Sequence, residues 1–243
     1  MSLTQDAVSG GALVLYQSEN GYRFGLDAIL LATDLPQLIT KPHIVDLGAG
    51  NGVAGLCIAT RLEHSKVFCV ELQESLYALL LRNIARHDLL HQAIAIKADV
   101  KNLKALPAHT ADLVICNPPF YKVGQGKKSP SIERRLAHHE IGTQLRHFIA
   151  AAQYTSKPNG FFKLVLPPFR LEDVFEIVND TDFGIQSLRF IHARADREAY
   201  LVEILMKRGS RSPLEVRPAL VIHEGDQFSS EVKERFDNAA VPR

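Results

Sequence analysis

Residues 115–122 read Ile-Cys-Asn-Pro-Pro-Phe-Tyr-Lys and end an apolar run. Two consecutive prolines end a strand abruptly, because proline has no N–H for a ladder and a fixed φ. The end of the strand presents the Asn117 side-chain oxygen and the Pro118 carbonyl as two acceptors, and neither proline has a backbone N–H that would compete for them. Such a pair can hold both hydrogens of a planar NH2 group and restore electron density to its nitrogen for attack on an electrophile. Catalysis would then depend on alignment rather than on a general base.

Phe120 follows these acceptors and offers a ring on which a planar base could stack. We therefore predict Asn117, Pro118 and Phe120 as the catalytic residues. In isolation, the same four letters also fit a structural turn in which Asn117 caps the backbone and Phe120 packs into the core.

A glycine turn follows the first apolar run of the chain, which reads HIVDLGAG over residues 43–50. The turn from Asp46 to Gly52 has the pattern G-x-G-x-G, which lets a ligand approach the backbone without a Cβ in the way. Glu71 ends the second run, 21 residues beyond Gly50, where a carboxylate can accept hydrogen bonds from ribose hydroxyls. Asp99 ends the third run, where an acid can receive the exocyclic amine of a base.

Each of these acids alone could be a helix cap or a solvated strand end. Jointly they predict a nucleoside-containing cofactor, because the carboxyl edge of an open α/β sheet is where ligands bind. The residues predicted to bind it are Asp46, Gly48, Gly50, Gly52, Glu71, Leu72, Asp99, Val100 and Asn117.

Two cofactors fit a nucleoside site, a nicotinamide dinucleotide and S-adenosylmethionine. A dinucleotide carries a pyrophosphate that needs the third glycine of the longer fingerprint, and position 53 is Val53. The D-x-G-x-G-x-G form instead resembles the first motif of class I S-adenosylmethionine-dependent methyltransferases. We therefore predict S-adenosylmethionine as the cofactor.

The elements that position these residues alternate along the chain. Apolar runs at 43–50, 67–72, 93–100, 112–119 and 161–167 are separated by helical patterns, and 187–193 with 199–208 indicates an antiparallel hairpin. This predicts a seven-stranded α/β sheet that is mostly parallel and ends in an antiparallel hairpin, and such a sheet resembles the Rossmann-like sheet of class I methyltransferases. Residues 41–243 would form the methyltransferase domain. Residues 1–40 would form an extension, with a hairpin turning at Glu19-Asn20-Gly21 and a helix over 26–35.

The Asn-Pro-Pro-Phe stretch is similar to the catalytic motif of amino-methyltransferases that modify adenine N6, guanine N2 and protein glutamine. The whole chain resembles the bacterial family that methylates N6 of the adenosine next to the anticodon in a valine tRNA. The resemblance covers residues 21–31, 46–52, 117–121, 136–140 and 160–167. It implies that Asp27 closes over the methionine part of the cofactor, that Glu71 and Asp99 hold its adenosine, and that Asn117 to Phe120 hold the target base.

A basic segment runs from Tyr121 to His147, with six basic residues against two acidic ones, although the whole chain has a net charge of only +1. Such a segment beside the catalytic strand end suits phosphate contacts, so RNA is the predicted partner. The residues predicted to bind RNA are Tyr121, Lys122, Lys127, Lys128, Arg134 and Arg135. The alternative is a solvated loop.

His138-His139-Glu140 lacks a metal-site spacing, so no metal is expected.

Composition narrows the class of protein further. Three scattered cysteines without a C-x-x-C pair indicate a reducing compartment, and no apolar run is long enough to span a membrane. We expect a cytoplasmic enzyme that methylates N6 of an adenine in RNA, foremost tRNA. The alternatives are a methyltransferase for guanine N2 in ribosomal RNA or for a protein glutamine, and a non-catalytic RNA-binding protein that retains the fold.

Overall fold

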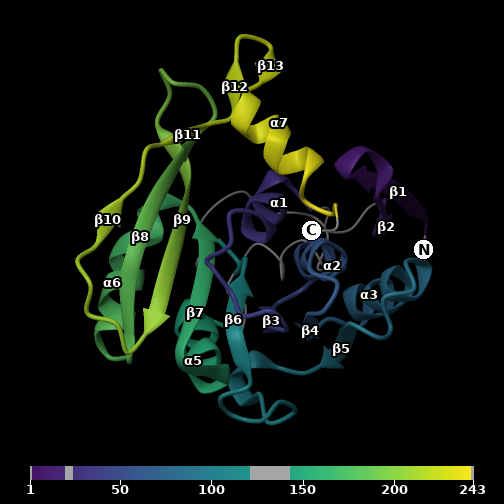
Figure 1. Ribbon diagram of the computed structural model, residues 1–243, viewed down its shortest axis with the longest axis horizontal. Helices are drawn as coiled ribbons and strands as arrows, with labels where there is room; N and C mark the ends of the chain where they lie inside the picture. The colour runs from purple at the N-terminus through teal and green to yellow at the C-terminus, as the bar shows by residue number, and fades with distance from the viewer. Residues whose placement is uncertain (1, 20–23, 121–142, 242–243) are drawn as a thin grey trace.

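The computed structural model describes residues 2–19, 24–120 and 143–241, and Figure 1 shows their arrangement. The central sheet has the strand order β10-β8-β9-β7-β6-β3-β4-β5, and β11 also pairs with β8. Its strands are β3 (His43–Leu47), β4 (Lys66–Glu71), β5 (Ala93–Lys97), β6 (Ala111–Cys116), β7 (Ser156–Leu166), β8 (Phe183–His192), β9 (Ala199–Arg208), β10 (Glu215–Val216) and β11 (Leu220–Val221). β3 to β7 pair in parallel, whereas β9 is antiparallel to both β7 and β8.

This topology confirms the predicted α/β sheet with its terminal antiparallel hairpin. The seven expected strands are present, and the described residues add β10 and β11 along the edge strand β8. Both additions are two residues long. The sequence did not indicate them, because two residues are too few to display an alternation of apolar and polar side chains.

Helices cover both faces of the sheet (Figure 1). Side chains alternate along each strand. Ile44 and Leu113 therefore enter one core, beneath α1, α2, α3 and α7, whereas Val45 and Val114 enter the other, beneath α5 and α6. The helices are α1 (Leu26–Ala32), α2 (Val53–Arg61), α3 (Glu74–Arg86), α5 (Leu145–Thr155), α6 (Leu171–Asn179) and α7 (Ser230–Asp237). Three short 3-10 turns are η1 (Ser9–Gly11), η2 (Val100–Asn102) and η3 (Pro168–Arg170).

The N-terminal hairpin of the described residues is one that the sequence did not indicate. β1 (Leu3–Val8) pairs with β2 (Leu13–Ser18) across η1. Gly10 and Gly11 both have positive φ, which glycine adopts without strain and which closes the turn there. The other edge of β2 faces α3, where the N–H groups of Val14 and Tyr16 bond to His87 and Asn83. The expected turn at 19–21 extends into residues outside the described ones.

The C-terminal end of the described chain lies beside η1 of the N-terminal hairpin (Figure 1). The Ser9 hydroxyl donates to the carbonyl of Phe236 and accepts from the N–H of Ala240, both at 2.8 Å. A small hairpin of β12 (His223–Glu224) and β13 (Gln227–Phe228) leads into α7. The expected division of the chain at residue 40 stays a prediction. No helix among the described residues is long and apolar enough to cross a membrane.

β7 begins at Ser156 rather than at Phe161, because Lys157 to Gly160 form an irregular part of the strand instead of a loop. Ser156 pairs with Ala111, and the register then shifts before Leu113 pairs with Phe161. Asn159 lies at φ +62° within this shift. α5 ends at Thr155, directly before this irregular start of β7.

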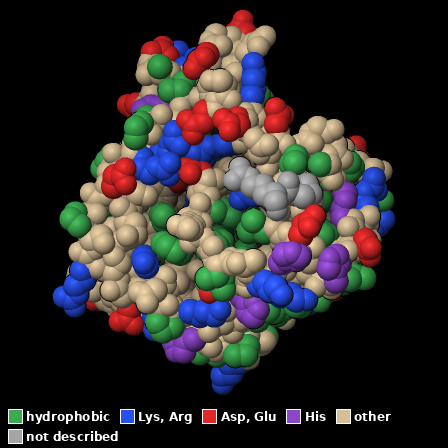
Figure 2. All heavy atoms as spheres, viewed as in Figure 1, with side chains coloured by type: hydrophobic (Ala, Val, Ile, Leu, Met, Phe, Trp, Pro, Cys, Tyr) green, Lys and Arg blue, Asp and Glu red, His purple; other side chains and the backbone are tan. Residues whose placement is uncertain are grey.

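Charged side chains of both signs are intermixed on the face shown in Figure 2, where blue and red groups lie against one another. Many of them are paired between elements distant in sequence. A network around α7 joins three arginines to three acids: Arg189, Arg217 and Arg235 with Asp34, Glu203 and Glu231. These charges hold α7 against β8, β9 and the segment that follows α1.

The strand order creates the place for a site. The chain leaves β3 for β4 on one side of it and later returns to β6 on the other side. At such a switch point the two following loops diverge and leave a crevice outside the carboxyl ends of the strands. The glycine turn follows β3 and Asn117 follows β6, so both lie at this crevice.

Candidate active site

The glycine turn is tied to the neighbouring strand by its backbone. The N–H groups of Gly48 and Ala49 both donate to the carbonyl of Val70 at 2.9 Å, and the N–H of Gly50 donates to the Glu71 carboxylate at 2.8 Å. Gly48 has φ +74°, and a Cβ there would stand 3.4 Å from the Phe148 ring. The turn therefore keeps a bare backbone surface between β3 and β4, close to a helix side chain.

Asp46 lies beneath this turn and is buried. Its Oδ2 accepts the N–H of Gly55 at 3.0 Å, which joins the end of β3 to the start of α2. Burial raises the pKa of the Asp46 carboxyl to about 7. The Gly55 hydrogen bond opposes that rise, and the nearby Glu71 charge adds to it. Asp46 thus holds the turn in place while also lining the cavity above it.

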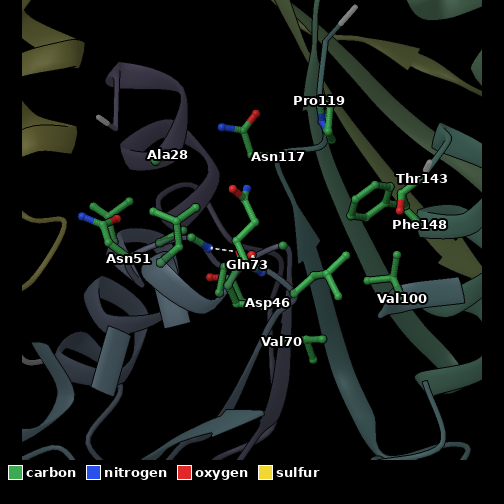
Figure 3. A pocket seen from close by; sticks show the side chains of 18 of the residues that line it. Ala28, Asp46, Asn51, Val70, Gln73, Val100, Asn117, Pro119, Thr143 and Phe148 are labelled. Atoms are coloured by element: carbon green, nitrogen blue, oxygen red, sulfur yellow. Dashed lines mark hydrogen bonds between the residues drawn. The ribbon is translucent and has the colours of Figure 1, made fainter. Parts of the chain in front are cut away.

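A cavity of about 310 Å³ opens at the crevice (Figure 3). Its size is in the range of small-molecule sites. Of the residues predicted to bind the cofactor, the following line it: Asp46, Gly48, Gly50, Glu71, Leu72, Asp99, Val100 and Asn117. Asp27, Gly52, Pro118 and Phe120 do not line it, although Asp27 contacts Asn117 directly.

Glu71 has a buried carboxylate that already takes two backbone donors. One oxygen accepts from Gly50 and the other accepts the N–H of Gln73 at 2.7 Å. Each carboxylate oxygen has a further lone pair, so the ribose hydroxyls of a nucleoside can still be received there. The bonds to the backbone fix the direction in which these lone pairs point.

Asp99 combines the two interpretations that the sequence left open. Its carboxylate accepts the N–H of Lys101 at 2.9 Å and so caps η2, and it also pairs with the Lys101 ammonium at 3.2 Å. Asp99 nevertheless lines the cavity together with its neighbour Val100. Capping and contact with a ligand are therefore compatible at this position.

The side chain of Asn117 is held by a residue that is distant in the sequence. Its Nδ2 donates to the carboxylate of Asp27 in α1 at 2.6 Å. Because a carboxylate only accepts, the amide must turn its nitrogen to Asp27 and its Oδ1 the other way. This Oδ1 is buried and has no hydrogen-bond partner among the described residues. The arrangement leaves Oδ1 as an acceptor without a partner among the described residues, and Figure 3 shows Asn117 at the cavity with Asn51 and Phe148.

α1 is fixed at its other end by a buried lysine. Lys163 of β7 donates to the carbonyls of Leu30 and Thr33, and it pairs with Glu203 of β9 at 3.0 Å. Burial lowers the pKa of the Lys163 ammonium, and the Glu203 charge opposes that change. The last carbonyls of α1 thus receive a cation, which suits a helix C-terminus. Asp27 is therefore presented by a helix that is held at both ends.

Phe120 is partly buried and packs against the core on the α1 face of the sheet. Its carbonyl accepts from the Arg170 guanidinium in η3 at 3.0 Å, which joins the end of the Asn-Pro-Pro-Phe stretch to the end of β7. Gly52 has a packing role, since a Cβ there would stand 2.5 Å from a Leu80 methyl. Gly52 thus lets α3 approach the turn.

The residues predicted to bind RNA lie outside the described ones: Tyr121, Lys122, Lys127, Lys128, Arg134 and Arg135. The structure in turn adds lining residues that the sequence did not single out, namely Ala28, Leu31, Asn51, Gln73, Leu76, Pro119, Thr143 and Phe148, among others. Asn51 lies within the glycine motif, so its position could have indicated it. Phe148 belongs to α5, which begins at Leu145, 97 residues after Gly48 of the turn. No local sequence pattern connects this helix with the turn.

The sequence pattern of the methyltransferase small domain matches residues 24–170, which is more than half of the chain. The chain belongs to the methyltransferase small domain family. This match confirms the predicted class of enzyme, a methyltransferase, with S-adenosylmethionine as its cofactor. The matched range contains the glycine turn, Glu71, Asp99 and Asn117.

Curated relatives support the same assignment. The tRNA1(Val) (adenine(37)-N6)-methyltransferase of Aeromonas hydrophila is 28% identical over 205 residues, which is 84% of each chain. The enzyme of the same name from Flavobacterium psychrophilum is 26% identical over 164 residues, covering 68% of this chain and 69% of the relative.

Solved structures share the fold. A predicted O-methyltransferase from Agrobacterium tumefaciens superposes with a TM-score of 0.72 at 25% identity, over 89% of this chain and 99% of that one. TYW2 from Pyrococcus horikoshii, solved in complex with MeSAdo, superposes with a TM-score of 0.60 at 16% identity, over 86% of this chain and 72% of that one. The latter similarity concerns the fold alone.

The residues of the cavity fit S-adenosylmethionine. The bare backbone of the glycine turn, the anchored Glu71 carboxylate and the apolar Val70, Val100 and Phe148 form a site with polar and apolar parts. Asn51 also lines the cavity with a buried Oδ1 that has no partner among the described residues. Buried polar atoms of this kind cost free energy unless a ligand or water satisfies them. Their presence in a preformed cavity is what a polar ligand requires.

Proposed function

We propose that this methyltransferase transfers a methyl group from S-adenosylmethionine to the exocyclic N6 amine of an adenine in RNA, at a tRNA nucleotide next to the anticodon. The observation that carries the proposal is the Asn117 amide, whose nitrogen is bound by Asp27 and whose buried oxygen remains an acceptor. A planar amine needs such an acceptor, because its lone pair is delocalised into the ring.

In this proposal the protein acts by alignment. S-adenosylmethionine supplies an electrophilic methyl group on a sulfonium centre. The Asn117 Oδ1 accepts one hydrogen of the target amine, and the Pro118 carbonyl accepts the other. Both acceptors are fixed before the substrate arrives, so no reorganisation is needed in the transition state. Asp27 does not touch the base; it keeps the amide of Asn117 in the productive orientation.

The other half of the proposed site binds the cofactor. Glu71 would receive the ribose hydroxyls, and Asp99 would receive an amine of the cofactor's adenine beside Val100. The anchoring of Glu71 by two backbone N–H groups supports this role, because a fixed carboxylate loses little freedom on binding. The Phe148 ring near Gly48 supports the same role for the apolar wall.

The choice of adenine in tRNA rests on the relatives, which are named for that reaction and align with most of this chain. The basic segment 121–147 favours nucleic acid over a protein glutamine. For that segment we propose that Lys127 and Lys128 contact phosphates. Neutralising both should weaken RNA binding and flatten its dependence on salt, whereas an unchanged salt slope would remove them from the RNA surface.

The test of the activity is methyl transfer to RNA that has not been modified. The purified protein is incubated with labelled S-adenosylmethionine and total RNA from a strain that lacks it, followed by nucleoside mass spectrometry. We expect N6-methyladenosine in the tRNA fraction. Label in methylguanosine, or only in protein, would contradict the proposal. Calorimetry with S-adenosylmethionine separates the remaining alternative, since a non-catalytic RNA-binding protein need not bind the cofactor.

A further inference from the structure

Tyr200 is the extra residue of a β-bulge at the rim of the candidate site. In the β8–β9 hairpin, Ile191 pairs with Leu201 but His192 pairs with Ala199, which leaves Tyr200 without an opposite residue. A bulge changes the direction of a side chain, and bulges are frequent beside active sites. The ring is 41% exposed, although the next residue, Leu201, is only 3% exposed.

The Tyr200 hydroxyl lies within the electrostatic influence of Asp27, the residue that orients Asn117. Partial burial raises the pKa of the Tyr200 phenol to about 12, and the Asp27 carboxylate contributes to that rise. A phenol that remains protonated at physiological pH carries no negative charge that would repel a phosphate. The phenol thus offers a neutral, flat face.

A second aromatic side chain lies at the same rim. Phe169 in η3 is 56% exposed, whereas its neighbour Arg170 is buried and donates to the carbonyl of Phe120. Leu166, near the end of β7, pairs with Val202 of β9, so η3 and the start of β9 lie side by side. Two exposed rings therefore stand where the Asn-Pro-Pro-Phe stretch leaves the sheet.

We propose that Tyr200 and Phe169 form a stacking surface for unpaired nucleobases that flank the target adenine. This rests on the proposed function and extends it, because it assigns recognition of the RNA loop to described residues rather than to basic side chains. Unpaired bases stack on aromatic side chains without regard to sequence, and every loop nucleotide presents such a face. A paired base in a duplex offers no such face, so the surface selects single-stranded RNA.

The test compares four variants in binding of a fluorescent stem–loop RNA and in methyl transfer. Tyr200→Ala and Phe169→Ala should each raise the Kd for the stem–loop and the KM for RNA roughly tenfold. The kcat at saturating RNA and the affinity for S-adenosylmethionine should stay within about threefold, since neither ring holds the cofactor in this proposal. Tyr200→Phe keeps the ring and should bind as the parent protein does.

The matched control is Phe175→Ala. Phe175 in α6 is 44% exposed, but it lies at the opposite end of β8 and β9 from Tyr200, beside Phe183 at the start of β8 and Arg208 at the end of β9. It should leave RNA binding unchanged. Equal effects of Tyr200→Ala and Phe175→Ala would overturn the stacking surface, as would a loss in Tyr200→Phe as large as in Tyr200→Ala.

The stacking surface and the proposed activity fail in different ways. If the protein methylates guanine instead of adenine in RNA and Tyr200→Ala still weakens binding of the stem–loop, the stacking surface stands and the proposed base is wrong. If the protein methylates adenine and the two alanine variants bind the stem–loop as the parent does, only the stacking surface is wrong.

Discussion

The two halves of the candidate site are built in different ways. In the half that follows β3 and β4, side chains bond to backbone groups a few residues away or on the adjacent strand, as Glu71 does with Gln73 and Gly50. In the half that follows β6, the essential bond joins Asn117 to Asp27, 90 residues earlier. The first half is rigid because of local geometry, whereas the second depends on how α1 is placed by the whole fold.

The largest expected effect concerns the acceptor itself. Asn117→Ala should lower kcat by about 100-fold or more, as loss of one fixed polar group in an active site does. The Kd for S-adenosylmethionine, measured by calorimetry, should change by no more than a few-fold, because the amide acts on the other substrate. Equal losses of cofactor binding and turnover would erase the distinction between the two halves.

A second prediction concerns the cofactor half. Glu71→Gln keeps the shape of the side chain but removes the charge that accepts from Gly50 and Gln73. The Kd for S-adenosylmethionine should rise roughly tenfold, the difference between a charged and a neutral set of hydrogen bonds. Turnover should return at saturating cofactor. A persistent loss of kcat would assign Glu71 to the target half as well.

A third prediction isolates the coupling between Asp27 and Asn117. Asp27→Ala should lower kcat about fivefold, which corresponds to a coupling free energy near 1 kcal/mol between Asp27 and Asn117. Asp27→Asn should restore part of the lost kcat. In the Asn117→Ala background the same Asp27→Ala change should have no further effect on kcat. An additive loss in the double variant would mean that Asp27 acts independently, for example on the cofactor.

The last prediction concerns the free energy of unfolding rather than catalysis. The pKa of Asp46 is about 7 in the folded protein against 3.8 in an unfolded chain, so the folded state binds more protons between these values. Stability should therefore fall as the pH rises through this window, by at most about 1.4 kcal/mol per pH unit. Asp46→Asn should remove that component of the slope in urea unfolding at pH 5, 6 and 7. Parallel curves for the two proteins would show that Asp46 does not titrate there.

Local patterns in the sequence were sufficient to predict the sheet and many of the residues in the cofactor half of the site. The seven main strands, the glycine turn and the acids at two strand ends follow from periodicity and from residue types that act within a few positions. Eight of the residues predicted for the cofactor line one cavity. The pairing of β2 with β1 was not predicted, and the glycines at η1, which both have positive φ, close the turn between these strands.

The sequence by itself determined which ligand-binding residue types follow the ends of the strands, and it determined that Asn-Pro-Pro-Phe supplies two acceptors. Each of these features depends on contiguous residues. Only the tertiary structure decided which way the Asn117 amide turns, that Phe148 approaches Gly48, and that a bulge turns Tyr200 to the rim. These contacts join residues far apart in the chain. Their geometry is set by the packing of α1, α5 and β9 on a common sheet, and no local pattern of residues encodes it.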